Sequence, residues 1–177
     1  LDQFAKKKTL KIYADSREKS SGALKYLVDK DVEVSMKTLD VGDFILSGRV
    51  GVERKEVRDF VDSLIDKRLL QQVQALKKSY ERPLLIIEGS EDIFSVRKVH
   101  PSAIRGMLAW IVIDLKVPVV YTKDFRETAE MMITIAKREQ EENSKDFGIR
   151  GERKPLSDTE LQEYIMSGLP GVGPSLA

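Results

Sequence analysis

Hydrophobic and polar positions follow two different periods along the chain, and the switches between them predict its elements. Short apolar runs that alternate with polar residues, or carry no polar break, predict strands, whereas apolar residues three and four apart predict helices. Strands are predicted over 9–14, 32–38, 84–87 and 118–121, with a β-hairpin over 42–55. The continuous apolar run 84–87 implies cover on both faces, and 118–121 is predicted to be another buried strand. Helices are predicted from 22 to at least 28, over 56–80 with a possible break at 66–68, and over 101–115 and 125–142. Strands that alternate with helices favour an α/β domain with a mixed sheet.

A polar stretch after the last long helix divides the chain. Residues 1–142 hold the alternating pattern and are predicted to form one domain, and 143–155 are polar and contain glycine, which is typical of a linker. Residues 156–177 begin with a short predicted helix and end around the turn Gly171-x-Gly173. A length of 177 residues fits one ordinary domain with a small appendage, and the initial Leu indicates a fragment of a longer protein.

The predicted hairpin carries the most informative chemistry. Two short apolar runs flank a tight turn that contains glycine. Because side chains on a strand alternate between faces, Glu53 and Lys55 are predicted to point one way and Arg54 the other. The hairpin also brings Asp43 alongside them. Two carboxylates and one ammonium group suit a hard divalent cation with a lysine beside it, which is an arrangement that cleaves phosphodiesters.

A second copy of the Glu-Arg-Lys tripeptide shows how little the tripeptide means alone. A third of the residues are charged, so such a triplet arises easily by chance. Glu152-Arg153-Lys154 lies in a polar stretch, with no predicted strand before it and no partnering acid, and is interpreted as solvated linker. Spacing alone therefore leaves two interpretations of the first copy, a metal site or an exposed hairpin.

Composition narrows the kind of metal that the hairpin could hold. The chain has no cysteine, which excludes disulfides, thiolate zinc sites and a cysteine nucleophile. Its single histidine, His100, precedes Pro101 at a predicted helix start, where a surface side chain is the simpler interpretation. A site built from carboxylates favours magnesium or manganese over zinc.

Charge and hydropathy narrow the range of partners. The net charge is only +1, so any contact with DNA must come from local patches such as Lys6-Lys7-Lys8 or Lys67-Arg68. Either patch is equally compatible with a solvated face. No apolar run approaches the roughly 20 residues needed to span a bilayer and no signal peptide is present, so no membrane partner is expected.

Three groups of residues, in order along the chain, resemble the motifs of the XPF family of structure-specific endonucleases. Gly42-Asp43, Glu53-Arg54-Lys55 and Asp59 match its nuclease signature, which is Gly-Asp, a variable hairpin and Glu-Arg-Lys-x-x-x-Asp. Asp15-Ser16-Arg17-Glu18 is similar to the family's upstream Asp-x-Arg-Glu element. The segment 169–174, Leu-Pro-Gly-Val-Gly-Pro, resembles the first hairpin of the helix-hairpin-helix module that follows the nuclease. The resemblance is strongest to archaeal members in which a helicase precedes the nuclease.

This resemblance implies a fold, a reaction and partners. The fold is a restriction-endonuclease-like α/β nuclease domain, with a mixed central sheet flanked by helices, followed by a truncated helix-hairpin-helix segment. The reaction is cleavage of phosphodiester bonds in branched DNA, such as forks and flaps, by in-line attack of a metal-activated water, with Mg²⁺ or Mn²⁺ as cofactor. A homodimer through the nuclease domain, an N-terminal helicase and an intracellular location are also implied, the last cytoplasmic in an archaeon and nuclear in a eukaryote.

The matching positions receive roles from the same resemblance. Asp43 and Glu53 are expected to ligate the metal, and Lys55 to lie near the attacking water and the phosphate. Asp59 is expected in the active centre, although capping of the next helix also explains an acid there. Arg54 belongs to the motif, but strand alternation favours a structural role.

The outlying motif positions receive roles with open alternatives. Arg17 is expected to clamp a phosphate with its guanidinium fork. Asp15 and Glu18 either add carboxylates to the site or pair with Arg17. Gly171 and Gly173 hold a phosphate through backbone N–H groups, or form only a helix C-cap and turn.

Two further classes of function compete with a nuclease. The family also contains non-catalytic DNA-binding or scaffold subunits with decayed active centres, and a helicase accessory that only dimerises is a third class. The intact metal ligands, Lys55 and Asp59 argue against decay. The helix predicted over 101–115 is apolar almost all round, so it needs a second copy of the chain to cover its spare face, unless it is fully internal.

Overall fold

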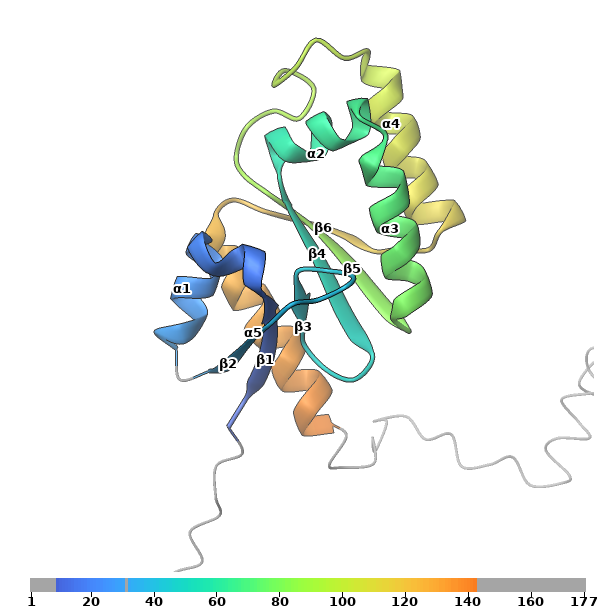
Figure 1. Ribbon diagram of the computed structural model, residues 1–177. Helices are drawn as coiled ribbons and strands as arrows, with labels where there is room; N and C mark the ends of the chain where they lie inside the picture. The colour runs from blue at the N-terminus through green and yellow to red at the C-terminus, as the bar shows by residue number, and fades with distance from the viewer. Residues whose placement is uncertain (1–8, 31, 143–177) are drawn as a thin grey trace, which may run out of the picture. The chain divides into compact units, whose positions relative to one another are not determined.

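The structure, a computed structural model, describes residues 9–30 and 32–142 of the chain. Its centre is a six-stranded sheet with the strand order β2-β1-β3-β4-β5-β6. Figure 1 shows α1 and α5 on one side of this sheet and α2, α3 and α4 on the other. The predicted α/β domain with a mixed sheet and flanking helices is therefore confirmed.

The elements follow the predicted order. The strands are β1 (Lys11–Asp15), β2 (Glu33–Lys37), β3 (Phe44–Ile45), β4 (Val50–Glu56), β5 (Arg82–Glu88) and β6 (Val119–Thr122). The helices are the 3-10 turn η1 (Ser16–Ser20), α1 (Gly22–Val28), α2 (Val57–Ile65), α3 (Arg68–Ser79), α4 (Pro101–Ala109), the π-helical turn η2 (Trp110–Asp114) and α5 (Phe125–Glu142). Lys67, in the left-handed backbone region at φ 61°, makes the predicted break between α2 and α3. The helix predicted over 101–115 is thus an α-helix that continues into a π-helical turn.

The predicted hairpin is the antiparallel pair β3–β4, in which Phe44 lies opposite Val52. The strand β1 runs antiparallel to β3, whereas β1–β2, β4–β5 and β5–β6 are parallel pairs. The backbone of Asp43 joins both neighbours: its N–H donates to the carbonyl of Val52 and its carbonyl accepts from the N–H of Asp15, each over 2.8 Å. Asp43 is therefore held between the end of β1 and the middle of β4.

Two hydrophobic cores lie on opposite faces of the sheet. The core beneath α1 and α5 takes Leu84 and Ile86 from β5, and the core beneath α2, α3 and α4 takes Leu85 and Ile87 from the same strand. The prediction that this apolar run is covered on both faces is confirmed. The prediction of a second buried strand over 118–121 is wrong, because β6 is an edge strand whose Tyr121 side chain is 52% exposed.

Close packing ties the end of α3 to the hairpin. A Cβ atom on Gly51 would lie 2.3 Å from the Tyr80 ring, so only glycine leaves room for that ring on β4. The Tyr80 hydroxyl donates to the carbonyl of Val41 over 3.0 Å. Gly42, next to it, has φ +82°, a conformation that side chains with a Cβ rarely adopt. The segment that presents Asp43 is thereby fixed against α3.

Several predictions fall outside the described residues. These are the linker, the helix-hairpin-helix segment with Gly171 and Gly173, the second Glu-Arg-Lys copy and the Lys6-Lys7-Lys8 patch. Among the described residues, no helix is both long enough and apolar enough to cross a membrane.

Candidate active site

The hairpin brings Asp43, Glu53 and Lys55 together at one end of the sheet. Glu53 and Lys55 are buried, at 5% and 3% exposure, although both carry charge. The Lys55 ammonium nitrogen lies 3.3 Å from a carboxylate oxygen of Glu53 and 3.3 Å from one of Asp59. The Asp43 carboxylate accepts a hydrogen bond from the backbone N–H of Arg54 over 2.8 Å. The predicted convergence of two carboxylates and one ammonium group is present.

The Arg54 side chain lies on the opposite face, as strand alternation predicts. Its guanidinium pairs with Glu88 through two nitrogens, and it lies 3.2 Å from Glu56 and 3.5 Å from Glu18. The hydroxyl of Thr128, on α5, donates to Glu88 over 2.6 Å. Arg54 therefore links β4 to β5, η1 and α5 behind the site instead of pointing into it.

Burial and like charge set the electrostatics of the two carboxylates. Burial raises the pKa of Asp43, while the N–H of Arg54 and the charge of Lys55 act in the opposite direction. Burial also raises the pKa of Glu53, and the neighbouring charge of Asp43 raises it further. Two carboxylates thus lie close together where water solvates them poorly, and a bound cation would stabilise their negative charge.

A cavity of about 250 Å³ opens onto these carboxylates. From the hairpin side and from η1 it is lined by Asp43, Glu53 and Arg17, and from α3 by Gln71 and Gln72. Hard carboxylate oxygens that face a small cavity fit Mg²⁺ or Mn²⁺, which complete their coordination with water. Among the described residues, 9–30 and 32–142, no group of three or more His, Cys, Asp or Glu side chains is arranged to hold a metal ion.

Asp15 and Arg17 form one unit at the rim of this cavity. Asp15 is fully buried, and its carboxylate accepts from the backbone N–H and the side chain of Arg17, over 2.8 and 2.6 Å, and from the N–H of Leu39 over 2.7 Å. The Arg17 hydrogen bond, together with those backbone bonds, lowers the pKa of Asp15 to about 2. The Arg17 side chain is 71% exposed, so part of its guanidinium faces solvent. Of the two alternatives for Asp15, the structure has the pairing with Arg17.

Glu18 pairs with Arg54 rather than with Arg17. One of its carboxylate oxygens lies 3.5 Å from the Arg54 guanidinium and, although buried, accepts no hydrogen bond from the described residues. Burial, followed by the charge of Asp43, raises the pKa of Glu18. Glu18 is therefore close enough to Asp43 to respond to its charge, but it belongs to the ion cluster around Arg54.

Asp59 lies in the first turn of α2 and is half exposed. Its ion pair with Lys55 connects it to the carboxylate cluster, and its other carboxylate oxygen lies 4.0 Å from Arg68. Helix position and contact with Lys55 both favour an acid here. Asp59 therefore shares the Lys55 ammonium group with Glu53 and helps to orient it.

Sequence reasoning did not single out Gln72, Glu88 or Thr128. Gln72 interrupts the apolar spacing of α3. This break is visible in the sequence, and it is informative because polar residues are uncommon on a buried helix face. Glu88 directly follows the apolar run of β5, but nothing in the sequence indicates that its partner is Arg54. Thr128 reaches Glu88 only because α5 packs across the sheet.

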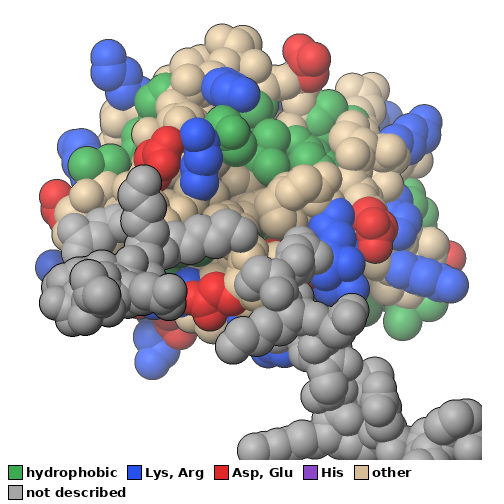
Figure 2. Space-filling model, turned by 90° about the horizontal axis from the view of Figure 1, so that it is seen from below, with side chains coloured by type: hydrophobic (Ala, Val, Ile, Leu, Met, Phe, Trp, Pro, Cys, Tyr) green, Lys and Arg blue, Asp and Glu red, His purple; other side chains and the backbone are tan. Residues whose placement is uncertain are grey.

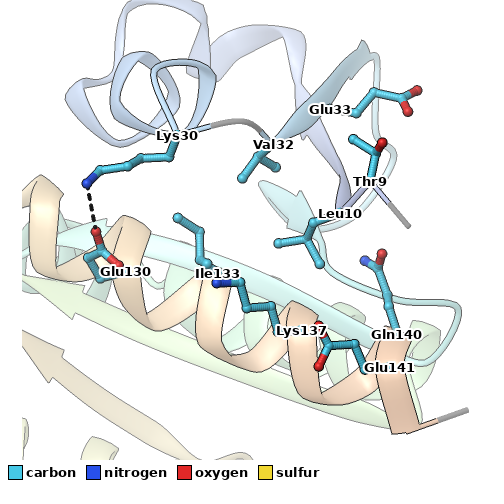
Figure 3. Close-up of a pocket in the computed structure, with 10 residues that line it drawn as sticks. All are labelled: Thr9, Leu10, Lys30, Val32, Glu33, Glu130, Ile133, Lys137, Gln140 and Glu141. Carbon is cyan, nitrogen blue, oxygen red and sulfur yellow. Dashed lines mark ion pairs between the residues drawn. The ribbon is translucent and has the colours of Figure 1, made fainter. Parts of the chain in front are cut away.

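A second and larger cavity, of about 910 Å³, lies between β2 and α5 (Figure 3). Leu10, Val32 and Ile133 supply apolar side chains to it, and Lys30 and Glu130 form an ion pair across it over 3.6 Å. None of the predicted site residues in the described part of the chain lines this cavity. Its size alone does not make it the active site, since the titratable cluster lies elsewhere.

Basic and acidic side chains are mixed over the described surface. Figure 2 shows Lys and Arg side chains interspersed with Asp and Glu on the face seen from below, where grey atoms do not cover it. Arg68 of the predicted Lys67-Arg68 patch lies 3.3 Å from Asp66, so much of its charge is compensated locally. Contact with a phosphate remains a prediction for this patch.

Comparison with known proteins gives consistent matches. Residues 14–135 match the family model described as the ERCC4 domain. The chain is 42% identical to a "Putative ATP-dependent RNA helicase MJ1505" of Methanocaldococcus jannaschii, over 97% of this chain and 21% of the relative. It is 37% identical to the "3'-flap repair endonuclease Xpf" of Saccharolobus solfataricus, over 95% of this chain and 73% of the relative. The solved structure of XPF from Aeropyrum pernix matches with a TM-score of 0.71 at 28% identity, covering 93% of this chain and 78% of that one, and its complex with DNA matches with a TM-score of 0.67.

Proposed function

Because this chain belongs to the ERCC4-domain family, the family of the XPF DNA repair endonucleases, we propose that it is a metal-dependent endonuclease that cuts phosphodiester bonds in branched DNA. The observation that carries the proposal is the cluster of Asp43, Glu53 and Lys55, in which Glu53 and Lys55 are buried, Asp43 is half-buried, and both carboxylates line one cavity. A stable fold does not need two adjacent, poorly solvated carboxylates, and perturbed groups of this kind cluster at functional sites.

Different residues of the chain have different roles in the in-line attack by water. Bound between Asp43 and Glu53, Mg²⁺ or Mn²⁺ would supply Lewis-acid chemistry at the phosphate and the water. Lys55, which pairs with both Glu53 and Asp59, would supply a compact positive charge to the negative charge that develops on the phosphate. Arg17 lines the same cavity with an exposed guanidinium, whose fork matches the phosphate oxygens.

The assembly that we propose is a homodimer formed by the nuclease domain. On the helix pair α4–η2 and the neighbouring edge strand β6, three large side chains are exposed: Val112 by 44%, Ile113 by 70% and Tyr121 by 52%. Exposed apolar surface next to an edge strand favours association with another protein chain. The commonest such assembly is a two-fold symmetric homodimer, in which each copy contributes the same surface. Such an interface typically buries about 2,000 Å² or more in total.

An N-terminal helicase is proposed for the longer protein, as in helicase–nucleases of the Hef type. The chain spans 21% of the length of the M. jannaschii relative, whose name describes a helicase. The helicase and the activity of the whole protein therefore rest on that relative and not on the described residues.

The direct test is cleavage of labelled DNA of three shapes, a fork, a flap and a plain duplex. With Mg²⁺ or Mn²⁺, the fork or the flap is expected to be cut well ahead of the duplex, and EDTA is expected to stop cleavage. Tight binding of the fork without cutting, in every divalent cation, would instead support a non-catalytic DNA-binding subunit. Efficient cutting of the duplex, or activity in EDTA, would contradict the proposal.

A further inference from the structure

A polar side chain interrupts the buried stripe of α3, beside the two carboxylates. Leu69, Val73 and Leu76 are fully buried on this helix. Gln72 lies three residues after Leu69 and four before Leu76, so it shares their face. Helix faces that pack on a core normally carry apolar residues at these spacings. Gln72 therefore departs from the pattern that stabilises the fold.

The amide of Gln72 has an oxygen that the fold leaves unsatisfied. Its Oε1 atom is buried and accepts no hydrogen bond from the described residues, and the residue lines the cavity that Asp43 and Glu53 also line. A buried acceptor without a partner destabilises a protein, which is why such groups are rare. A destabilising side chain such as this, in the same cavity as two carboxylates whose pKa values are raised, is typical of a functional site.

The position of the amide relative to the carboxylates is fixed by packing. Tyr80, directly after α3, packs its ring on Gly51 of β4 and donates its hydroxyl to the carbonyl of Val41. Leu76 of α3 contacts Gly42, the neighbour of Asp43, where an added Cβ would approach it to 3.2 Å. The helix and the hairpin thus form one rigid wall around the cavity, as a preorganised site requires.

We propose that Gln72 is a catalytic residue that binds the reacting groups between the two carboxylates. Its Oε1 accepts a hydrogen bond from the attacking water, and its Nε2 donates one to a non-bridging oxygen of the scissile phosphate. A side-chain amide offers a donor and an acceptor together, stays neutral, and adds no charge beside Asp43 and Glu53. Orientation of the attacking water by a glutamine is a recurring part of phosphoryl transfer.

The reaction balances without any proton transfer by Gln72. The water oxygen forms the new bond to phosphorus as the bond from phosphorus to the leaving sugar oxygen breaks. The water loses a proton to solvent and the leaving oxygen gains one from solvent. This role rests on the proposed nuclease function, since it needs a phosphodiester in the cavity.

The test compares Gln72→Met with Gln74→Met, which makes the same change on the same helix outside this cavity. Three quantities are measured for each: the single-turnover rate constant for fork cleavage in Mg²⁺, the Kd for the fork in EDTA, and Tm. For Gln72→Met we expect a rate constant about 10²-fold lower, as for loss of one transition-state hydrogen bond. Its Kd should stay within about twofold, and its Tm should be equal or higher because an unpaired buried acceptor is gone. Gln74→Met should cleave like the unaltered chain.

Each other outcome overturns the inference in a recognisable way. A Gln72→Met rate constant within about threefold of the unaltered chain removes Gln72 from catalysis while the nuclease function stands. A fall in Tm and fork affinity that parallels the fall in rate assigns Gln72 a structural role. If the unaltered chain leaves the fork intact, the proposed function fails and this inference fails with it.

Discussion

Replacement of Arg54 by methionine is predicted to destabilise the fold far more than an equivalent change at an exposed arginine. The Arg54 and Glu88 side chains are each only 8% exposed and pair through two nitrogens. Methionine keeps an unbranched side chain but removes the charge, which leaves Glu88 buried without its cation. Loss of one partner of a buried ion pair costs about 3–5 kcal/mol.

The structure places this loss near the lower end of that range. The hydroxyl of Thr128 still donates to Glu88 in the variant, so the buried Glu88 carboxylate keeps one hydrogen bond. A loss of about 3 kcal/mol is a large share of the stability of a typical domain and corresponds to a fall in Tm of about 10 °C.

Arg58→Met is the matched control. Arg58 forms a comparable ion pair with Glu91 over 2.7 Å, but the two side chains are 58% and 44% exposed. Solvent screens such pairs, so this variant should lose at most about 1 kcal/mol. Urea and thermal unfolding followed by circular dichroism give both free energies, and unchanged m values confirm that the same transition is compared. Equal losses in the two variants would refute the structural role of Arg54.

Two further predictions follow from Asp15 and from the exposed apolar face. Because the folded-state pKa of Asp15 is lowered to about 2, its charge stabilises the fold above about pH 4, and this contribution disappears as the pH falls from about 4 to 2. Asp15→Asn should therefore lower the free energy of unfolding by about 1–2 kcal/mol at pH 7 and by little at pH 2. The value at pH 7 allows for the solvent exposure of Arg17, which weakens the ion pair. If urea titrations gave the same loss at both pH values, the pairing of Asp15 with Arg17 would be contradicted. Light scattering should give 40.2 kDa for the unaltered chain, twice its 20.1 kDa, and Ile113→Glu should give monomer or aggregate. A clean 20.1 kDa monomer of the unaltered chain at micromolar concentration would rule out the dimer.

Local pattern predicted much of the fold because the elements have strong periodicity. Strand alternation alone placed Glu53 and Lys55 on one face and Arg54 on the other, and the contacts with Asp59 and Glu88 confirm this. The break at Lys67 was visible as a polar interruption of the apolar spacing. These features depend on residues close in sequence, for which pattern is informative.

The parts that pattern missed depend on packing between distant segments. An apolar run such as 118–121 has the same sequence pattern in an edge strand as in a central strand. The exposure of β6 therefore follows only from the strand order of the sheet. Glu88 meets Arg54 because β4 and β5 pair in parallel, and Thr128 joins them only because α5 packs across the sheet. In the sequence Gln72 is only a polar break in the apolar spacing of a helix, and its place at the cavity of Asp43 follows from how α3 packs.

The central claim is that the carboxylates of the β3–β4 hairpin form the catalytic centre. Its most direct test is the single-turnover cleavage of a labelled fork in Mg²⁺ by the unaltered chain, by Glu53→Gln and by Glu152→Gln, the same change in the second Glu-Arg-Lys copy. Glu53→Gln is expected to lower the rate constant by at least about 10²–10³-fold. Its Tm should stay nearly unchanged, because removal of one of two crowded like charges offsets the lost ion pair with Lys55, and Lys55 keeps its ion pair with Asp59. Glu152→Gln should cleave at the unaltered rate. Full activity of Glu53→Gln, or an equal loss in both variants, would contradict the account.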